Sequence, residues 1–139
     1  MRITQESDYA LRILTALASH DSVIDAKSLS VETSVTQRFT LKILHKLVIG
    51  DFVSSFKGTK GGYKLKVKPE KITLKSVIEL IDGPIVIARC LENSETCSLN
   101  QDKASCIYHH IFDKISLDLA IKLNKITIND VINKSYSLE

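Results

Sequence analysis

The chain of 139 residues is 44% hydrophobic and 25% charged, a composition typical of a folded globular protein. Its length corresponds to one ordinary domain, which excludes a large multidomain enzyme. The sequence has no run of about 18 uncharged apolar residues and no apolar signal-peptide core. We therefore expect a cytoplasmic protein that has no membrane partner.

Positive charge is concentrated in the first half of the chain. Residues 1–69 carry 11 Lys and Arg against 6 Asp and Glu, whereas residues 70–139 carry 8 against 10. This asymmetry predicts a module that binds a polyanion, and the alternative is a Lys-rich surface that is merely solvated. Residues 35–68 contain one acidic residue and eight basic ones, namely Arg38, Lys42, Lys46, Lys57, Lys60, Lys64, Lys66 and Lys68.

The first predicted helix covers residues 3–20. Glu6 and Asp8 lie in its first turns, where the helix dipole favours carboxylates, and His20 marks its end. The apolar residues that recur there at helical spacing are Ala10, Ile13, Leu14, Leu17 and Ala18.

Two more helices are expected before residue 50. The shorter one covers about 26–32 and has Asp25 as its N-cap, and the longer one covers about 36–49 and ends at Gly50. The apolar face of the longer helix is predicted to be Phe39, Ile43, Leu44, Leu47 and Val48.

A β-hairpin is expected next. Residues 52–56 and 63–67 read as strands, and the Gly-rich segment 57–62 joins them. Pro69 ends the second strand.

The second half of the chain is expected to be helical around one loop. Thr73 can cap a helix over about 74–81, residues 89–105 lack periodicity, and Thr127 opens a final short helix. A longer helix over about 104–124 carries the apolar stripe Ile107, Ile111, Ile115, Leu119 and Leu123. The whole pattern predicts a mainly α protein with a small β-hairpin.

Two helices joined by a tight turn and followed by a hairpin occur in this order in a winged helix-turn-helix domain. The second helix of such a domain enters the major groove of DNA, and the hairpin reaches the backbone or the minor groove. The candidate DNA-binding residues are Thr36, Gln37, Arg38, Thr40 and Lys42 on the helix and Lys57, Thr59, Lys60, Gly61 and Tyr63 on the hairpin.

The residue types in this set suit DNA. Gln37 can read adenine and Arg38 can read guanine through paired hydrogen bonds, while Thr36 and Thr40 can hold phosphates. Glycines would let the hairpin backbone approach DNA closely. The alternative is that the polar residues are ordinary surface groups and that the glycines only form the turn.

Three cysteines, Cys90, Cys97 and Cys106, lie within one predicted loop and the start of the next helix. Thiolates are soft ligands that suit iron–sulfur clusters, zinc or Cu(I). The spacing lacks the tight cysteine pairs of structural zinc sites, which favours a cluster. The alternatives are small buried side chains or a redox-active thiol pair.

A cluster held by three cysteines needs a fourth ligand. His109 lies three residues after Cys106 and so shares its helix face, whereas His110 points about 100° away. Asp8 is the other candidate, if a dimer brings the first helix of one chain to the loop of its partner. The residues leave this choice open.

Several segments resemble the IscR/NsrR/RirA/CymR type of bacterial transcription regulators, in the branch that binds iron–sulfur clusters. They are residues 1–14, 47–55, 57–63 and 73–83, so the resemblance spans nearly the whole chain. It implies a winged helix-turn-helix domain over 1–83, a cluster-binding loop over 84–106 and a dimerisation helix with a short terminal helix over 104–139. It also implies a homodimer in which the stripe of the 104–124 helix is the seam.

The resemblance also assigns residues. Cys90, Cys97 and Cys106 match the cluster cysteines, although their spacing is longer than usual. Asp8 matches the carboxylate that nitric-oxide-sensing members supply from the partner subunit, and His109 matches the histidine of IscR-like members. At Lys57 the IscR-like members often have arginine, whose planar fork lysine lacks. Regulators of cysteine metabolism lack the three cysteines.

These expectations combine into one functional prediction. The chain is expected to be a DNA-binding repressor, not an enzyme, whose binding to operator DNA responds to an iron–sulfur cluster, with 2Fe-2S favoured and 4Fe-4S possible. The signal would be iron–sulfur status, redox state or nitric oxide. One alternative is a cluster-free regulator that senses redox state through its thiols, and another is an iron–sulfur carrier without DNA binding.

Overall fold

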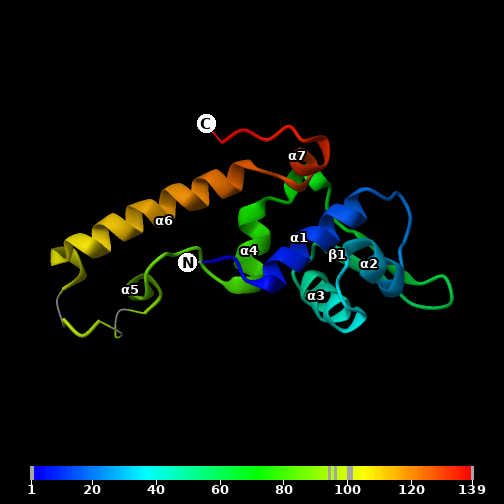
Figure 1. The fold of residues 1–139 in the computed structure, drawn as a ribbon, viewed down its shortest axis with the longest axis horizontal. Helices are drawn as coiled ribbons and strands as arrows, with labels where there is room; N and C mark the ends of the chain where they lie inside the picture. Colours follow the sequence, from blue (N-terminus) through cyan, green and yellow to red (C-terminus); the bar gives the residue numbers. More distant parts are fainter. Residues whose placement is uncertain (1, 94, 96, 100–101, 139) are drawn as a thin grey trace.

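The computed structural model describes residues 2–93, 95, 97–99 and 102–138. It consists of helices around one small two-stranded sheet, as the sequence predicts (Figure 1). The core lies where α1 (Gln5–Ala18) contacts α2 (Ala26–Thr33), α3 (Gln37–Ile49) and α4 (Leu74–Asp82). Its fully buried side chains include Ile13, Leu14, Leu29, Ile43, Leu44, Leu47 and Val77.

Side-chain caps set the start of most of these helices. Thr4 caps α1, so this helix begins two residues later than the sequence suggests. Asp25 caps α2 by accepting a hydrogen bond from the backbone N–H of Ser28 at 3.1 Å. Thr73 caps α4 and Thr127 caps α7 (Ile128–Asn133), each within a capping box. The predicted caps of α2, α4 and α7 are therefore confirmed.

The hairpin consists of β1 (Val53–Phe56) and β2 (Gly62–Leu65), paired antiparallel. Tyr63 extends this pairing to the segment before α2, because its N–H and C=O exchange hydrogen bonds of 2.8 and 2.9 Å with Ile24. The hairpin, called the wing below, is thereby anchored to the helix-turn-helix. Its loop projects at the right of Figure 1.

The second half of the chain extends away from the helical core after α4 and comes back to it at α7. After α4 the chain leads through α5 (Arg89–Glu92) to α6 (Ile107–Lys125), which runs back to α7 (Figure 1). α7 packs on α1, and α6 packs on α4. Backbone hydrogen bonds join the start of α4 to the segment between α6 and α7. The N–H of Leu74 donates to the carbonyl oxygen of Ile126, and the N–H of Ile128 donates to that of Ile72, both at 2.9 Å.

Two short elements differ from the sequence-based expectation. Residues Arg89–Glu92 form the four-residue helix α5 inside the predicted loop. Residues Lys103–Ser105 form a 3₁₀ turn, and α6 begins only after Cys106. Single turns of this length carry no periodicity, so a sequence pattern cannot show them.

Candidate DNA interface and cysteine segment

The turn between α2 and α3 orients the predicted recognition helix, α3. Ser34 ends α2 in a left-handed conformation (φ 55°), and the buried side chain of Val35 fixes the turn on the core. Thr36 caps α3 through a hydrogen bond of 3.3 Å from a backbone N–H. Gln37 and Arg38 are consequently exposed in the first turn of α3, where a groove-binding helix presents its side chains.

Thr40 faces the core. Its side chain is fully buried together with Ile43 and Leu44, whereas Phe39 is 39% exposed and packs edge-on against Tyr9 with the ring centroids 5.9 Å apart. The predicted apolar face of α3 is thus confirmed at Ile43, Leu44 and Leu47, whereas Thr40 takes the buried position expected for Phe39. The prediction that Thr40 holds a phosphate is wrong, because a fully buried hydroxyl cannot reach DNA.

The exposed side of α3 carries Lys42, but an acidic residue of α1 holds this lysine. Glu6 forms ion pairs of 2.5 Å with Lys42 and with Lys46, one helical turn further along α3. The hydrogen bonds from the two ammonium groups lower the pKa of Glu6 below its ordinary value. From the sequence, Glu6 was expected only to interact favourably with the dipole of α1. Nothing in the sequence indicated Lys42 and Lys46, which lie 36 and 40 residues further along the chain, as its partners.

The wing exposes Lys57, Thr59 and Lys60 in its loop. Gly61 and Gly62 lie so close to neighbouring backbone atoms of the protein that a side chain would not fit at either position. A Cβ on Gly61 would lie 2.3 Å from the carbonyl oxygen of Phe56, and one on Gly62 would lie 2.4 Å from that of Ile24. Tyr63 is half-buried against the core and joined to Ile24 through its backbone. These three residues shape and anchor the wing.

Ion pairing reduces the set of cations available to a polyanion. Three of the eight basic residues in the segment 35–68 have acidic partners: Lys42 and Lys46 share Glu6, and Lys66 contacts Asp51 at 3.0 Å. Among the described residues no ion pair involves the other five, which are Arg38, Lys57, Lys60, Lys64 and Lys68. The basic surface therefore includes the start of α3 and the wing.

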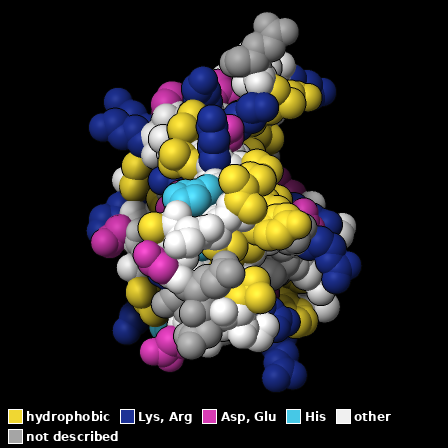
Figure 2. Space-filling model, turned by 90° about the vertical axis from the view of Figure 1, so that its left-hand side faces the viewer, with side chains coloured by type: hydrophobic (Ala, Val, Ile, Leu, Met, Phe, Trp, Pro, Cys, Tyr) yellow, Lys and Arg dark blue, Asp and Glu magenta, His cyan; other side chains and the backbone are white. Residues whose placement is uncertain are grey.

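The described residues of the cysteine segment, which spans 84–106, extend to the opposite end of the molecule from the wing (Figure 1). Cys90 belongs to α5, Cys97 follows it, and Cys106 occupies the N-cap position of α6. All three are free, half-buried thiols. Figure 2, which views this end of the molecule, shows hydrophobic side chains gathered beside a histidine.

The candidate fourth ligands lie on different helices. Asp8 is exposed on α1 and forms an ion pair of 2.7 Å with Arg12. His109 is half-buried on α6, with its ring centroid 6.2 Å from that of His110. His110 is engaged elsewhere, because its Nε2 lies 2.9 Å from the carbonyl oxygen of Ala104.

The donor types suit an iron–sulfur cluster, because three free thiols lie within one segment. Their described positions do not form a site. Within residues 2–93, 95, 97–99 and 102–138, no three Cys, His, Asp or Glu side chains lie close enough together to hold a metal ion. The cysteine segment would have to change conformation for its three sulfurs to hold one group.

Comparison with known proteins decides the family. Residues 3–134 match the family model Rrf2, described as an iron-dependent transcriptional regulator. The chain belongs to the Rrf2 family. Its relatives include a helix-turn-helix transcriptional regulator of Aquifex aeolicus, 31% identical over 126 residues, which are 90% of this chain and 87% of the relative. The regulator NsrR of Bacillus subtilis is 24% identical over 99% of this chain and 94% of NsrR.

Solved structures show the same fold. CymR of B. subtilis, the global cysteine regulator, has a TM-score of 0.78 with 22% identity and covers 98% of this chain and 99% of its own. This Rrf2-family chain is a DNA-binding transcription regulator, since its relatives are named as regulators and not as enzymes. In the described part of the chain, no helix combines the length and apolar character needed to span a bilayer.

Proposed function

We propose that this Rrf2-family regulator is a homodimeric repressor whose affinity for operator DNA depends on an iron–sulfur cluster held by Cys90, Cys97 and Cys106. Two observations support the cluster. The family is described as iron-dependent, and the three cysteines are free thiols on a single segment. A 2Fe-2S cluster is the favoured form and a 4Fe-4S cluster the other. The cytoplasmic location stays a prediction.

The exposed start of α3 is the proposed base-reading surface. Gln37 and Arg38 reach base edges in the major groove, and Thr36 lies beside them at the cap. Lys57 and Lys60 of the wing hold phosphates. Thr59 lies between them in the same exposed loop, while Lys42 contributes only as far as Glu6 releases it.

The exposed face of α6 is the proposed dimer seam. Leu119 and Leu123 of the predicted stripe are half-buried, so they face their own chain at least in part. The large apolar side chains that α6 leaves exposed are Ile107, Tyr108, Ile111, Ile115, Leu117 and Ile121. An exposed apolar surface of this kind is typical of an interface between copies. With a seam here, the resemblance implies that Asp8 of one subunit would approach the cysteine segment of its partner.

The cysteine segment is joined to both parts of the fold that it would have to control. It follows Gly83 at the end of α4 and leads into α6 at Cys106. Within it, the backbone N–H of Ile87 donates a hydrogen bond of 3.0 Å to the buried hydroxyl of Ser116 on α6. When bound, a cluster would supply metal–thiolate bonds that respond to oxidants and nitric oxide. Gain or loss of these bonds would shift α4 and α6 between two arrangements.

The observation that carries the DNA-binding proposal is that Arg38 on α3 and Lys57 and Lys60 of the wing are all exposed and form no ion pair with any residue that the structure describes. Binding of a duplex from the promoter of its own gene tests it by fluorescence anisotropy. Lys60→Gln should weaken binding to every duplex, whereas Lys134→Gln at the far C-terminus should not. Equal binding by both variants would contradict the proposed wing contact.

Absorption spectra test the cluster. Protein purified without oxygen should be brown, and Cys97→Ala should be colourless. The Asp8→Ala and His109→Ala variants, compared under the same conditions, distinguish the two candidate fourth ligands. A wild-type protein that takes up no iron during reconstitution would contradict the cluster proposal.

A thiol switch is the second candidate. Cys90, Cys97 and Cys106 are free thiols on one segment, and thiols of this kind can be oxidised to a disulfide. In this case peroxide should produce a disulfide between two of the three cysteines, detectable by mass spectrometry, in protein that contains no iron. An iron–sulfur carrier is the third candidate, and salt-sensitive nanomolar binding to a duplex would exclude it.

A further inference from the structure

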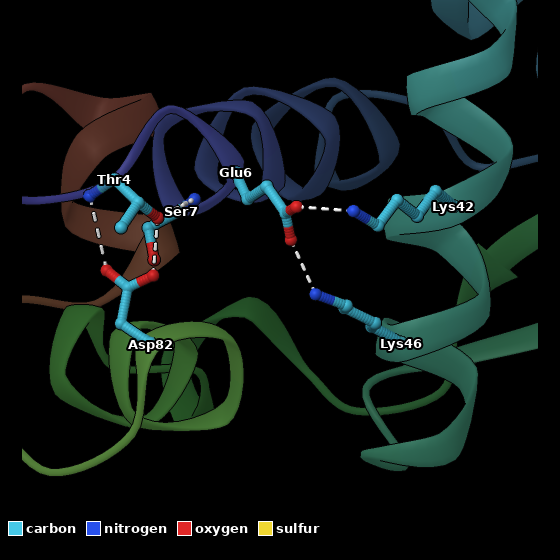
Figure 3. A network of polar contacts seen from close by, with 6 residues as sticks. All are labelled: Thr4, Glu6, Ser7, Lys42, Lys46 and Asp82. Carbon is cyan, nitrogen blue, oxygen red and sulfur yellow. Dashed lines mark hydrogen bonds and ion pairs between the residues drawn. The ribbon is translucent and has the colours of Figure 1, made fainter.

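Glu6 holds two cations of the recognition helix from outside that helix. Its two carboxylate oxygens each accept a hydrogen bond from one lysine ammonium, Oε1 from Lys42 and Oε2 from Lys46 (Figure 3). One carboxylate of α1 thus spans one turn of α3. Both lysines lie on the side of α3 that faces the start of α1.

The first turn of α1, which carries Glu6, is itself fixed at its other side. Asp82, the last residue of α4, accepts hydrogen bonds from the N–H of Thr4 at 3.2 Å and from the Thr4 hydroxyl (Figure 3). The Thr4 hydroxyl in turn accepts one from the N–H of Ser7 at 3.2 Å. The position of Glu6 is therefore set between the end of α4 and the recognition helix.

We propose that Glu6 competes with DNA phosphate for Lys42 and Lys46. By holding these two lysines, Glu6 limits the number of cations that α3 offers to a duplex. This inference rests on the proposed DNA binding. It makes Glu6 a positioning residue that sets the affinity and the salt dependence of the complex without touching DNA.

The competition follows from how phosphates bind. A lysine that neutralises a phosphate releases condensed counterions, and each such contact steepens the fall of log K with log salt by about 0.9. A lysine held by Glu6 must first leave its carboxylate. Glu6 is ionised at neutral pH, since the two lysines lower its pKa.

The geometry leaves the lysines within reach of a polyanion. The side chain of Lys42 is 51% exposed and that of Lys46 is 35% exposed, so phosphate can approach either one. The ammonium of Lys42 also lies 5.9 Å from the ring centre of Phe39, which keeps it near the surface of α3. Ion pairs that only held α1 and α3 together in the protein interior would not leave the lysines exposed to this extent.

The test compares two variants that change net charge equally. Glu6→Gln frees both lysines. Glu79→Gln removes an exposed carboxylate on α4 whose one ion pair among the described residues is with Lys75 of the same helix, at 3.8 Å. Binding to a non-specific duplex is measured from 50 to 300 mM KCl. Glu6→Gln should steepen the salt slope by about 0.9 for each lysine that engages phosphate, up to about 3.6 for a dimer. Glu79→Gln should match the wild type.

A second pair of variants separates competition from a structural role. In the wild-type background Lys46→Gln should change the slope little, whereas in the Glu6→Gln background it should reverse part of the increase. Weaker DNA binding of Glu6→Gln at an unchanged slope, or a slope equal to that of Glu79→Gln, would overturn the inference. If the wild type itself shows no salt-dependent binding to any duplex, the proposed function fails instead.

Discussion

Replacing Thr40 by valine should stabilise the protein and leave its affinity for DNA unchanged. The Thr40 hydroxyl is fully buried and lacks a hydrogen-bond partner among the described residues. An unpaired buried hydroxyl costs about 1–3 kcal/mol, and valine has nearly the same shape without it. The free energy of unfolding should therefore rise by about 1–2 kcal/mol, which raises Tm by roughly 3–8 °C in a chain of this size.

The matched control is Thr36→Val, four residues earlier in the same helix. Its hydroxyl caps α3, so its removal should lower the stability by about 1 kcal/mol. Urea unfolding followed by circular dichroism, at one fixed protein concentration, measures both changes. A destabilised Thr40→Val variant, or one that binds the duplex more weakly, would refute the assignment of this residue to the core.

Three further predictions follow from the packing and the charges. Gly62→Ala should destabilise the protein by about 2–4 kcal/mol, because the added Cβ would meet the backbone of Ile24. Gly58→Ala should cost less, since a Cβ there would have no neighbour within 4 Å, and equal losses of unfolding free energy in urea would contradict this difference. If α6 forms the proposed dimer seam, Ile115→Glu should turn the wild-type dimer into a monomer in sedimentation, and a dimer that persists in this variant would place the seam elsewhere. Glu6 has a lowered pKa in the folded state, so its stabilising contribution is complete above its unfolded pKa near 4.5 and is lost as the pH falls through the folded pKa. Glu6→Gln should therefore lose less stability than the wild type on acidification, and acid-unfolding profiles that are identical for the two proteins would contradict the stabilising role of Glu6.

Local chemistry made much of the fold predictable from the sequence. Asp25, Thr73 and Thr127 cap helices where expected, because a cap depends only on neighbouring backbone N–H groups. The wing was equally visible, since two short alternating runs flank a glycine-rich loop. Such features need no information about distant residues.

What the sequence could not show depends on tertiary neighbours. Thr40 lies three and four residues before Ile43 and Leu44, within the buried face of α3, but a polar side chain does not register in a hydrophobic pattern. Phe39 registers in that pattern, yet it lies at the edge of the face, where it packs against Tyr9 of α1. The ion pairs of Glu6 join residues 36 and 40 positions apart. Whether three sulfurs come together depends in the same way on spatial arrangement, so cysteine spacing could suggest the ligand type but not the site, and among the described residues no such site is formed.

Control of DNA binding by the cysteine segment is tested most directly by comparing operator binding of the cluster-loaded and cluster-free forms of the same protein. Both forms are prepared without oxygen, and their binding to the promoter upstream of the protein's own gene is measured by fluorescence anisotropy at one salt concentration. If the cluster controls DNA binding, the two dissociation constants should differ by at least about fivefold, and this difference should be abolished in Cys97→Ala. Equal dissociation constants for the two wild-type forms would contradict control of DNA binding by the cysteine segment.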